Sequence, residues 1–190
     1  MKFIYSLLVV VLLSACGTAT NLGNPAKEPV QNVAQDESSN ENFHFQLVSE
    51  KEQYHVGDKL EIRAVLTYKG EQQSVDIGHG GSWVWLNTTN LTEDYRFGTA
   101  MNEPYIITKM QKDVPIVQTY RFSGGAYDSH MDGQPFSDKI YMQMAEMNFP
   151  PGQYEIYGRT DFVIEGSGGQ KQLLEARIIF EVIEQTAAEK

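Results

Sequence analysis

The segment from Ile77 to Trp85 holds the residues of this chain best suited to contact a ligand. Three glycines surround His79, and Trp83 and Trp85 follow at alternate positions. Glycine allows close backbone approach, and an imidazole can titrate near neutral pH or bind a metal ion. The segment predicts either a ligand-contacting loop with an aromatic platform, or a tight turn beside packed tryptophans. A strand follows it, not a helix, which argues against phosphate binding.

A second candidate is the loop that contains Asp128, His130 and Asp132. These residues place oxygen and imidazole ligands at alternate positions before a glycine, as in the first half of a calcium-binding loop. The twelfth position of that pattern needs a bidentate glutamate, and here it is Lys139. The alternative is a hydrophilic loop that contains the same residues by chance and binds no ligand. If the fold brings His79 and His130 together, they could share a metal ion with a carboxylate.

Sequence signatures of enzymes are absent from the chain. It has no G-x-S-x-G elbow, no H-E-x-x-H pair, no P-loop and no dinucleotide fingerprint. The chain holds one cysteine, Cys16. Its position near the N-terminus predicts a role in targeting and not that of a catalytic nucleophile. We therefore expect a non-catalytic protein without a catalytic cofactor.

Cys16 lies where a bacterial lipoprotein signal would place it. Lys2 supplies a positive charge, Phe3 to Leu13 form an apolar run of 11 residues, and two small residues precede the cysteine. The run is too short to span a bilayer, which takes about 20 apolar residues. Leu13-Ser14-Ala15-Cys16 resembles the lipobox of bacterial lipoproteins, while an ordinary secretory signal with an incidental cysteine is the alternative.

The lipobox resemblance implies a location and a covalent lipid. Residues 1–15 would be removed as a signal peptide, and Cys16 would carry diacylglycerol, with a further acyl chain such as palmitate on its amine. The protein would then be anchored at the extracytoplasmic face of a cell membrane, in a bacterium of the Gram-positive type. Because no second cysteine exists, the fold must form without an intrachain disulfide.

The charge balance limits the class of partner. Removal of residues 1–15 takes away one lysine and no acidic residue, which changes the formal net charge from -10 to -11. An acidic field repels polyanions, and no long basic stretch is present. We expect no nucleic-acid partner.

The chain divides into a polar arm and one domain. Residues 16–42 hold scarcely any large apolar side chain, so we expect the lipidated cysteine and a disordered tether there. Residues 43–184 are expected to form the domain, and residues 185–190 a polar tail.

Alternation of apolar and polar residues runs through the domain and predicts strands. Turn residues such as Lys69-Gly70 and Pro150-Pro151-Gly152 separate the runs. Seven to nine short strands of this kind indicate an all-β fold, an antiparallel immunoglobulin-like β-sandwich. The expected strands contain residues 43–47, 60–68, 114–122, 140–144, 154–164 with a break at Gly158, and 174–182.

The residues before Tyr154 sharpen this prediction of the fold. Gly152 followed two residues later by Tyr154 resembles the tyrosine corner of immunoglobulin-like domains, in which the hydroxyl ties the preceding loop to the strand. The overall architecture is also similar to that of the intracellular proteinase inhibitor family of Gram-positive bacteria, and that similarity implies protease inhibition.

Three functions are therefore open at the level of sequence. The first is a lipid-anchored envelope module that binds a protein or a cell-wall component near the membrane. The second is protease inhibition. The third is binding of a metal ion or small ligand through His79 and the loop around Asp128, His130 and Asp132.

Overall fold

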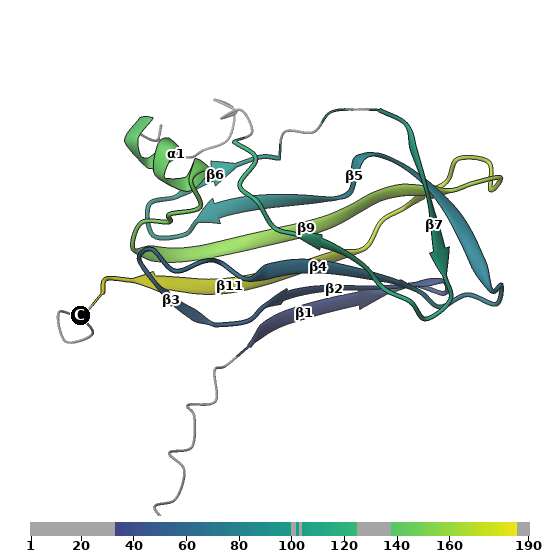
Figure 1. Cartoon of the computed structure of the whole chain (residues 1–190), viewed down its shortest axis with the longest axis horizontal. Helices are drawn as coiled ribbons and strands as arrows, with labels where there is room; N and C mark the ends of the chain where they lie inside the picture. Colours follow the sequence, from purple (N-terminus) through teal and green to yellow (C-terminus); the bar gives the residue numbers. More distant parts are fainter. Residues whose placement is uncertain (1–32, 100–101, 103, 125–137, 186–190) are drawn as a thin grey trace, which may run out of the picture. The chain divides into compact units, whose positions relative to one another are not determined.

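The chain folds into two β-sheets packed face to face (Figure 1). The computed structural model describes residues 33–99, 102, 104–124 and 138–185. Within these residues it contains eleven strands and one short helix. The elements are β1 (Ala34–Ser39), β2 (Phe43–Ser49), β3 (Gln53–His55), β4 (Ile62–Tyr68), β5 (Ser74–Asn90), β6 (Tyr95–Phe97), β7 (Ile106–Gln111), β8 (Ile116–Thr119), α1 (Asp138–Ala145), β9 (Gly152–Ile164), β10 (Lys171–Gln172) and β11 (Glu175–Ile183).

The two sheets differ in size. The four-stranded sheet has the order β1-β2-β4-β8, and the seven-stranded sheet has the order β3-β11-β9-β5-β6, with β7 also pairing β5 and β10 pairing β9. The named strands pair antiparallel, except that β3 runs parallel to β11. The centre of the larger sheet is therefore the long β5, β9 and β11.

Aromatic side chains join the two sheets in the core. Phe43 of the smaller sheet meets Phe162 of the larger one edge to face, with ring centroids 4.9 Å apart. Phe45 contacts Trp83 in the same edge-on manner. Edge-to-face contacts add to the stabilisation from burial, so they favour this alignment of the sheets.

The structure confirms the predicted all-β sandwich and its tyrosine corner. The strands expected at residues 43–47, 60–68 and 174–182 correspond to β2, β4 and β11. The Tyr154 hydroxyl donates a hydrogen bond to the carbonyl oxygen of Pro150 at 2.8 Å. Burial, the largest effect, raises the pKa of Tyr154 well above its ordinary value. The hydroxyl therefore stays protonated and ties the loop to β9.

The predicted count of seven to nine strands is too low. β3, β6 and β10 are three, three and two residues long. Strands this short cannot display an alternating pattern, and backbone hydrogen bonds to a neighbour define them instead. β7 is also absent from the prediction, because its residues are mostly exposed and show no inward stripe.

Residues 140–144 form part of a helix, and the strand predicted there is wrong. In α1, Met144 is fully buried and Ile140 packs against the core, while Met142 is 56% exposed. Positions four apart share one face of a helix, so the buried pair has helical spacing. Apolar side chains at alternate positions over only five residues are compatible with the period of a strand and with that of a helix. In this segment the chain forms the helix.

Gly158 does not interrupt β9, contrary to the prediction. The strand runs from Gly152 to Ile164 without a break. A Cβ at Gly158 would approach the Phe45 ring to 3.0 Å and Leu86 to 3.4 Å. The glycine is needed because aromatic packing comes close to the backbone, not because the chain turns.

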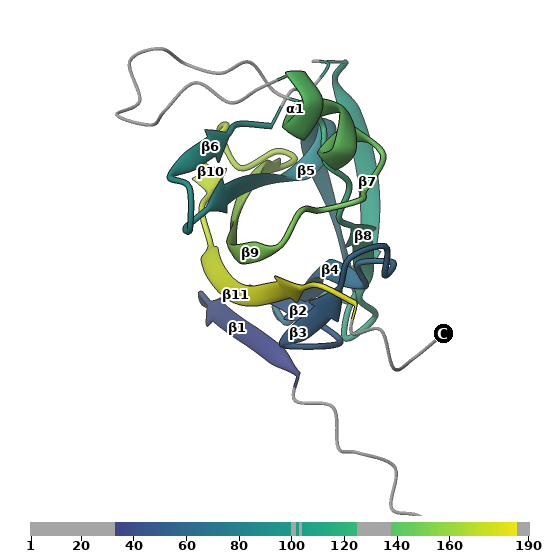
Figure 2. The same cartoon turned by 90° about the vertical axis from the view of Figure 1, so that its left-hand side faces the viewer.

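The tether predicted for residues 16–42 is wrong over residues 34–39, which form β1. The strand pairs with β2 along its length, and the Asp36 carboxylate accepts a hydrogen bond from the backbone N–H of Arg177 at 2.7 Å. Figure 2 shows β1 next to β11, so the strand lies at an edge shared by both sheets. Most β1 side chains are exposed, and composition therefore gave no sign of this backbone pairing.

Within the part of the chain that the structure describes, no helix has the length and apolar character required to cross a membrane.

Candidate functional site

The glycine-rich segment from Ile77 to Trp85 lies inside β5 and forms a bulge, not a loop. The pairing of β5 with β9 shifts between His79, opposite Phe162, and Val84, opposite Thr160. Four residues of β5 thus stand opposite one residue of β9. The extra length bends the strand and turns neighbouring side chains to different faces.

His79 is held within this bulge by two hydrogen bonds. Its side chain is buried, its Nδ1 lies 2.7 Å from the Gly80 carbonyl oxygen, and its Nε2 lies 2.8 Å from the Thr108 hydroxyl. A ring with its proton on Nδ1 donates to Gly80 and accepts from Thr108. Both ring nitrogens are therefore engaged, and no lone pair is left to bind a metal ion in this arrangement.

The two tryptophans have separate surroundings. Trp83 is 5% exposed and packs its ring edge against Phe45 in the core. Trp85 is half-buried, and its indole N–H donates to the Asp161 carboxylate at 3.0 Å. They do not form the shared aromatic platform that the sequence suggests, because the bulge directs Trp83 inward.

The other residues singled out by the sequence lie outside the described part of the chain. These are Cys16 and the loop residues Asp128, His130 and Asp132. The predicted pairing of His79 with His130 therefore also falls outside the described residues. Within residues 33–99, 102, 104–124 and 138–185, no three His, Cys, Asp or Glu side chains gather as a metal site would require.

The surface best suited to bind a partner is the outer face of the seven-stranded sheet. The register of β11, β9 and β5 aligns the outward side chains in rows across the sheet. Arg177, Tyr157 and Asn87 form one row, and the next contains Ile179, Glu155 and Thr89, which also pairs with Arg96 of β6. We call this surface the outer face. Aromatic, aliphatic, amide and charged groups are mixed on it.

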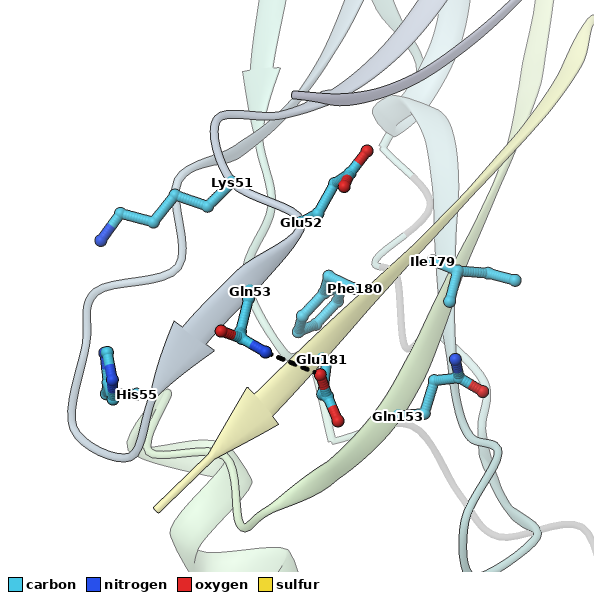
Figure 3. Close-up of a pocket in the computed structure, with 8 residues that line it drawn as sticks. All are labelled: Lys51, Glu52, Gln53, His55, Gln153, Ile179, Phe180 and Glu181. Carbon is cyan, nitrogen blue, oxygen red and sulfur yellow. Dashed lines mark hydrogen bonds between the residues drawn. The ribbon is translucent and has the colours of Figure 1, made fainter. Parts of the chain in front are cut away.

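A first concavity on the outer face, the β3 hollow, has a volume of about 640 Å³. Figure 3 shows Gln53 joined to Glu181 at its centre, with Ile179 and Gln153 to one side and Lys51 and His55 to the other. The Gln53 amide donates to the Glu181 carboxylate at 2.8 Å. This bond occupies the floor, so the β3 hollow is an open, polar depression.

An ionic cluster supports the flank of the β3 hollow. Burial alone would raise the pKa of Asp58, but hydrogen bonds from the His55 backbone and the Lys51 ammonium hold that pKa below its ordinary value. The Lys51 Nζ lies 3.2 Å from the Asp58 carboxylate and 5.5 Å from the centre of the Tyr54 ring. The cluster fixes the turn between β3 and β4.

A second concavity, the β5 hollow, adjoins the first and has a volume of about 500 Å³. Its lining consists of Asn87 and Thr89 of β5, Glu155 and Tyr157 of β9, Arg177 of β11, and five residues in and around β6: Leu91, Asp94, Arg96, Phe97 and Gly98. The short side chains of β5 lie between longer ones on both neighbouring strands. The hollow follows from this difference in side-chain length.

Tyr157 and Arg177 form a fixed pair at the wall of the β5 hollow. The guanidinium carbon of Arg177 lies 4.7 Å from the centre of the Tyr157 ring, and its Nη1 lies 3.9 Å from the Glu155 carboxylate. Burial and a hydrogen bond to Glu175 raise the pKa of Tyr157, so its hydroxyl is a neutral donor at physiological pH. Cation-π contact holds the ring and guanidinium in fixed positions.

Sequence patterns did not single out these residues, although their alternation is visible in the sequence. Glu155, Tyr157 and Arg159 alternate with buried positions of β9, as do Arg177 and Ile179 in β11. Alternation predicts that they face outward, but only the pairing register shows which of them meet across strands.

The chain matches no protein-family model and no protein among the curated ones with which it was compared.

Proposed function

We propose that this protein is a non-catalytic, lipid-anchored envelope protein whose sandwich binds a protein or cell-wall partner close to the membrane. The observation that carries the proposal is the outer face of the seven-stranded sheet. It presents the outward side chains of β11, β9 and β5 and has two adjoining hollows of about 640 and 500 Å³. The sandwich would present this face to the partner.

The composition of the outer face supports a binding role. Interface centres are enriched in tyrosine, arginine and large apolar residues, with a polar rim around them. Here Tyr157, Arg177 and the 49% exposed Ile179 lie at the centre, and Gln53 and Arg96 lie towards the two sides. The proposed occupant would cover Ile179 and contact both hollows.

The proposed lipid at Cys16 would raise the effective concentration of partners held at the same membrane. Binding between two tethered molecules is effectively intramolecular, so modest affinity at the outer face would suffice. A Cys16→Ser variant tests the anchor by itself, because it should release the protein into the medium. Retention of this variant in the membrane fraction would contradict lipid anchoring.

Site-specific photo-crosslinking on intact cells tests the binding face. A photoreactive residue at Ile179 reports on the outer face, and one at Val117 of β8 serves as the matched control. Both are branched apolar residues, 49% and 55% exposed, on opposite sheets. We expect a discrete adduct from position 179 and none from position 117. The same adducts at both positions, or no adduct at either together with no co-sedimentation with purified cell walls, would overturn the proposal.

A further inference from the structure

The β5 hollow has polar groups arranged on its floor and on both sides. Asn87 and Thr89 form the floor, and the Asn87 carboxamide oxygen already accepts hydrogen bonds from the backbone N–H and hydroxyl of Thr99. Its amide N–H groups remain as donors for a ligand. Glu155 supplies an acceptor on one side, and Arg96 supplies donors on the other.

The backbone of β5 is not open to a peptide strand at this point. Residues 88–90 pair with β6 on one side and with β9 on the other. A peptide that binds by strand addition needs a free edge with unpaired N–H and C=O groups. A ligand of the β5 hollow therefore does not bind by adding a strand to β5 at these residues.

The charges of the hollow disfavour an anion and favour a neutral polar ligand. Arg96 lies 3.7 Å from Asp94, and Arg177 lies 3.9 Å from Glu155, so each guanidinium has a carboxylate nearby. A phosphate would meet both carboxylates as well as the arginines. A hydroxyl group can donate to a carboxylate and accept from a guanidinium or amide, and it satisfies both kinds of group.

We propose that the β5 hollow binds an oligosaccharide of pyranose units, with a C–H face of one sugar ring against Tyr157. The face of the Tyr157 ring opposite Arg177 would take the flat face of a pyranose, because C–H groups favour the negative face of an aromatic ring. The hydroxyls would bond to Asn87, Thr89 and Glu155. A volume of about 500 Å³ lies within the range of small-molecule sites, about 300–1,000 Å³. The inference rests on the proposed binding role and deepens it by naming the ligand class.

Calorimetric titration of the purified full-length chain tests the inference. The detergent must lack a sugar head group, and the probes are tetrasaccharides of β-1,4-linked glucose and of β-1,4-linked N-acetylglucosamine. We expect one of them to bind, Tyr157→Ala to weaken Kd about tenfold, and Thr89→Val to weaken it about threefold. Co-sedimentation with purified cell walls then separates a wall glycan from a free saccharide as the source.

Two control variants make the result specific. Tyr157→Phe keeps the ring and loses only the hydroxyl that bonds to Glu175, so its Kd should stay within about twofold of the unchanged chain. Thr119→Val removes an exposed hydroxyl from β8 in the opposite sheet, and it should leave Kd unchanged. Thr89→Val should fold normally, since valine suits a strand, so it tests the site even if Tyr157→Ala fails to fold.

Two results would overturn the inference. One is no heat of binding with either tetrasaccharide at millimolar concentration, and the other is binding that Tyr157→Ala and Thr89→Val leave unchanged. A discrete crosslink from Ile179 combined with no saccharide binding would leave the proposed binding role standing and identify the occupant as a protein. Saccharide binding without a crosslink on cells would support the inferred ligand class and count against the proposed partner on cells.

Discussion

The bulge of β5 and the outer face lie in the same sheet, yet they use their residues in opposite ways. The bulge contains rare residue types: a histidine among three glycines, and two tryptophans. Of these, His79 forms internal hydrogen bonds and Trp83 packs in the core. The outer face has common residue types at alternate positions, and their side chains line two hollows. Rare residue types can therefore mark a demanding piece of the framework as readily as a site.

The difference follows from where polar groups find their partners. In the bulge, both nitrogens of His79 have partners within the protein, whereas the Asn87 amide N–H groups and the Glu155 carboxylate line an open hollow. Substitutions in the bulge should therefore change stability and leave binding intact, and substitutions on the outer face should do the reverse.

Trp83→Ala should cause the largest loss of stability. Removal of a buried tryptophan leaves a cavity beside Phe45, and such changes cost about 3–5 kcal/mol. For a domain of this size the melting temperature should fall by about 6–20 °C. The matched variant Trp85→Ala should lose less than half as much, because Trp85 is half-buried. Equal losses in thermal unfolding would show that the two tryptophans share one environment after all.

His79→Ala should destabilise the fold by about 1–3 kcal/mol, because Thr108 and the Gly80 carbonyl lose their buried partner. Urea unfolding measures this loss. Addition of zinc or calcium should shift the melting temperature of the unchanged chain and of His79→Ala equally, if the imidazole serves only the framework. A metal-dependent shift present in the unchanged chain and lost in the variant would make His79 a ligand.

Tyr154 and Glu155 are neighbours on β9 that face opposite sides, so they compare framework and outer face within one strand. Tyr154→Phe removes the bond to Pro150 and the bond from the buried Asn90 amide, and should cost about 1–2 kcal/mol without altering the crosslink from position 179. Glu155→Gln should leave the unfolding free energy within about 0.5 kcal/mol and change binding. Unfolding curves and crosslinking yields of both variants measure these effects. A loss of stability in Glu155→Gln together with a loss of crosslinking in Tyr154→Phe would contradict the division between framework and outer face.

The smallest effect concerns pH at the contact between Trp85 and Asp161. Burial alone would raise the pKa of Asp161, but hydrogen bonds from Lys171 and Trp85 hold it below its ordinary 3.8. The charged form therefore stabilises the fold above that value, and this contribution is lost as pH falls through the lower pKa of the folded chain. Asp161→Asn, which can still accept from Trp85, should show a shallower loss of stability below about pH 4, by less than about 1 kcal/mol. Identical acid unfolding curves would contradict this.

Much of the framework was predictable from residue patterns. Alternation in β2, β4 and β11 identified half-buried strands, and the spacing of Gly152 and Tyr154 identified the tyrosine corner. The missed elements have a common physical cause. β1 and β10 are held by backbone hydrogen bonds and place few apolar side chains in the core, so their composition carries no signal. The candidate site was missed because it joins residues that only the register brings together.

The fold class follows from the sequence, because alternating apolar residues require two faces that pack together. It also supplies the prediction of lipid attachment at Cys16, which depends on a short local motif. The inward direction of Trp83, and the hollow that Tyr157, Arg177 and Thr89 share, depend instead on how the strands pair in three dimensions. Direction and proximity across strands depend on bulges and pairing register, and these are set by contacts between residues far apart in the chain, such as Ile77 and Ile164, which are 87 positions apart.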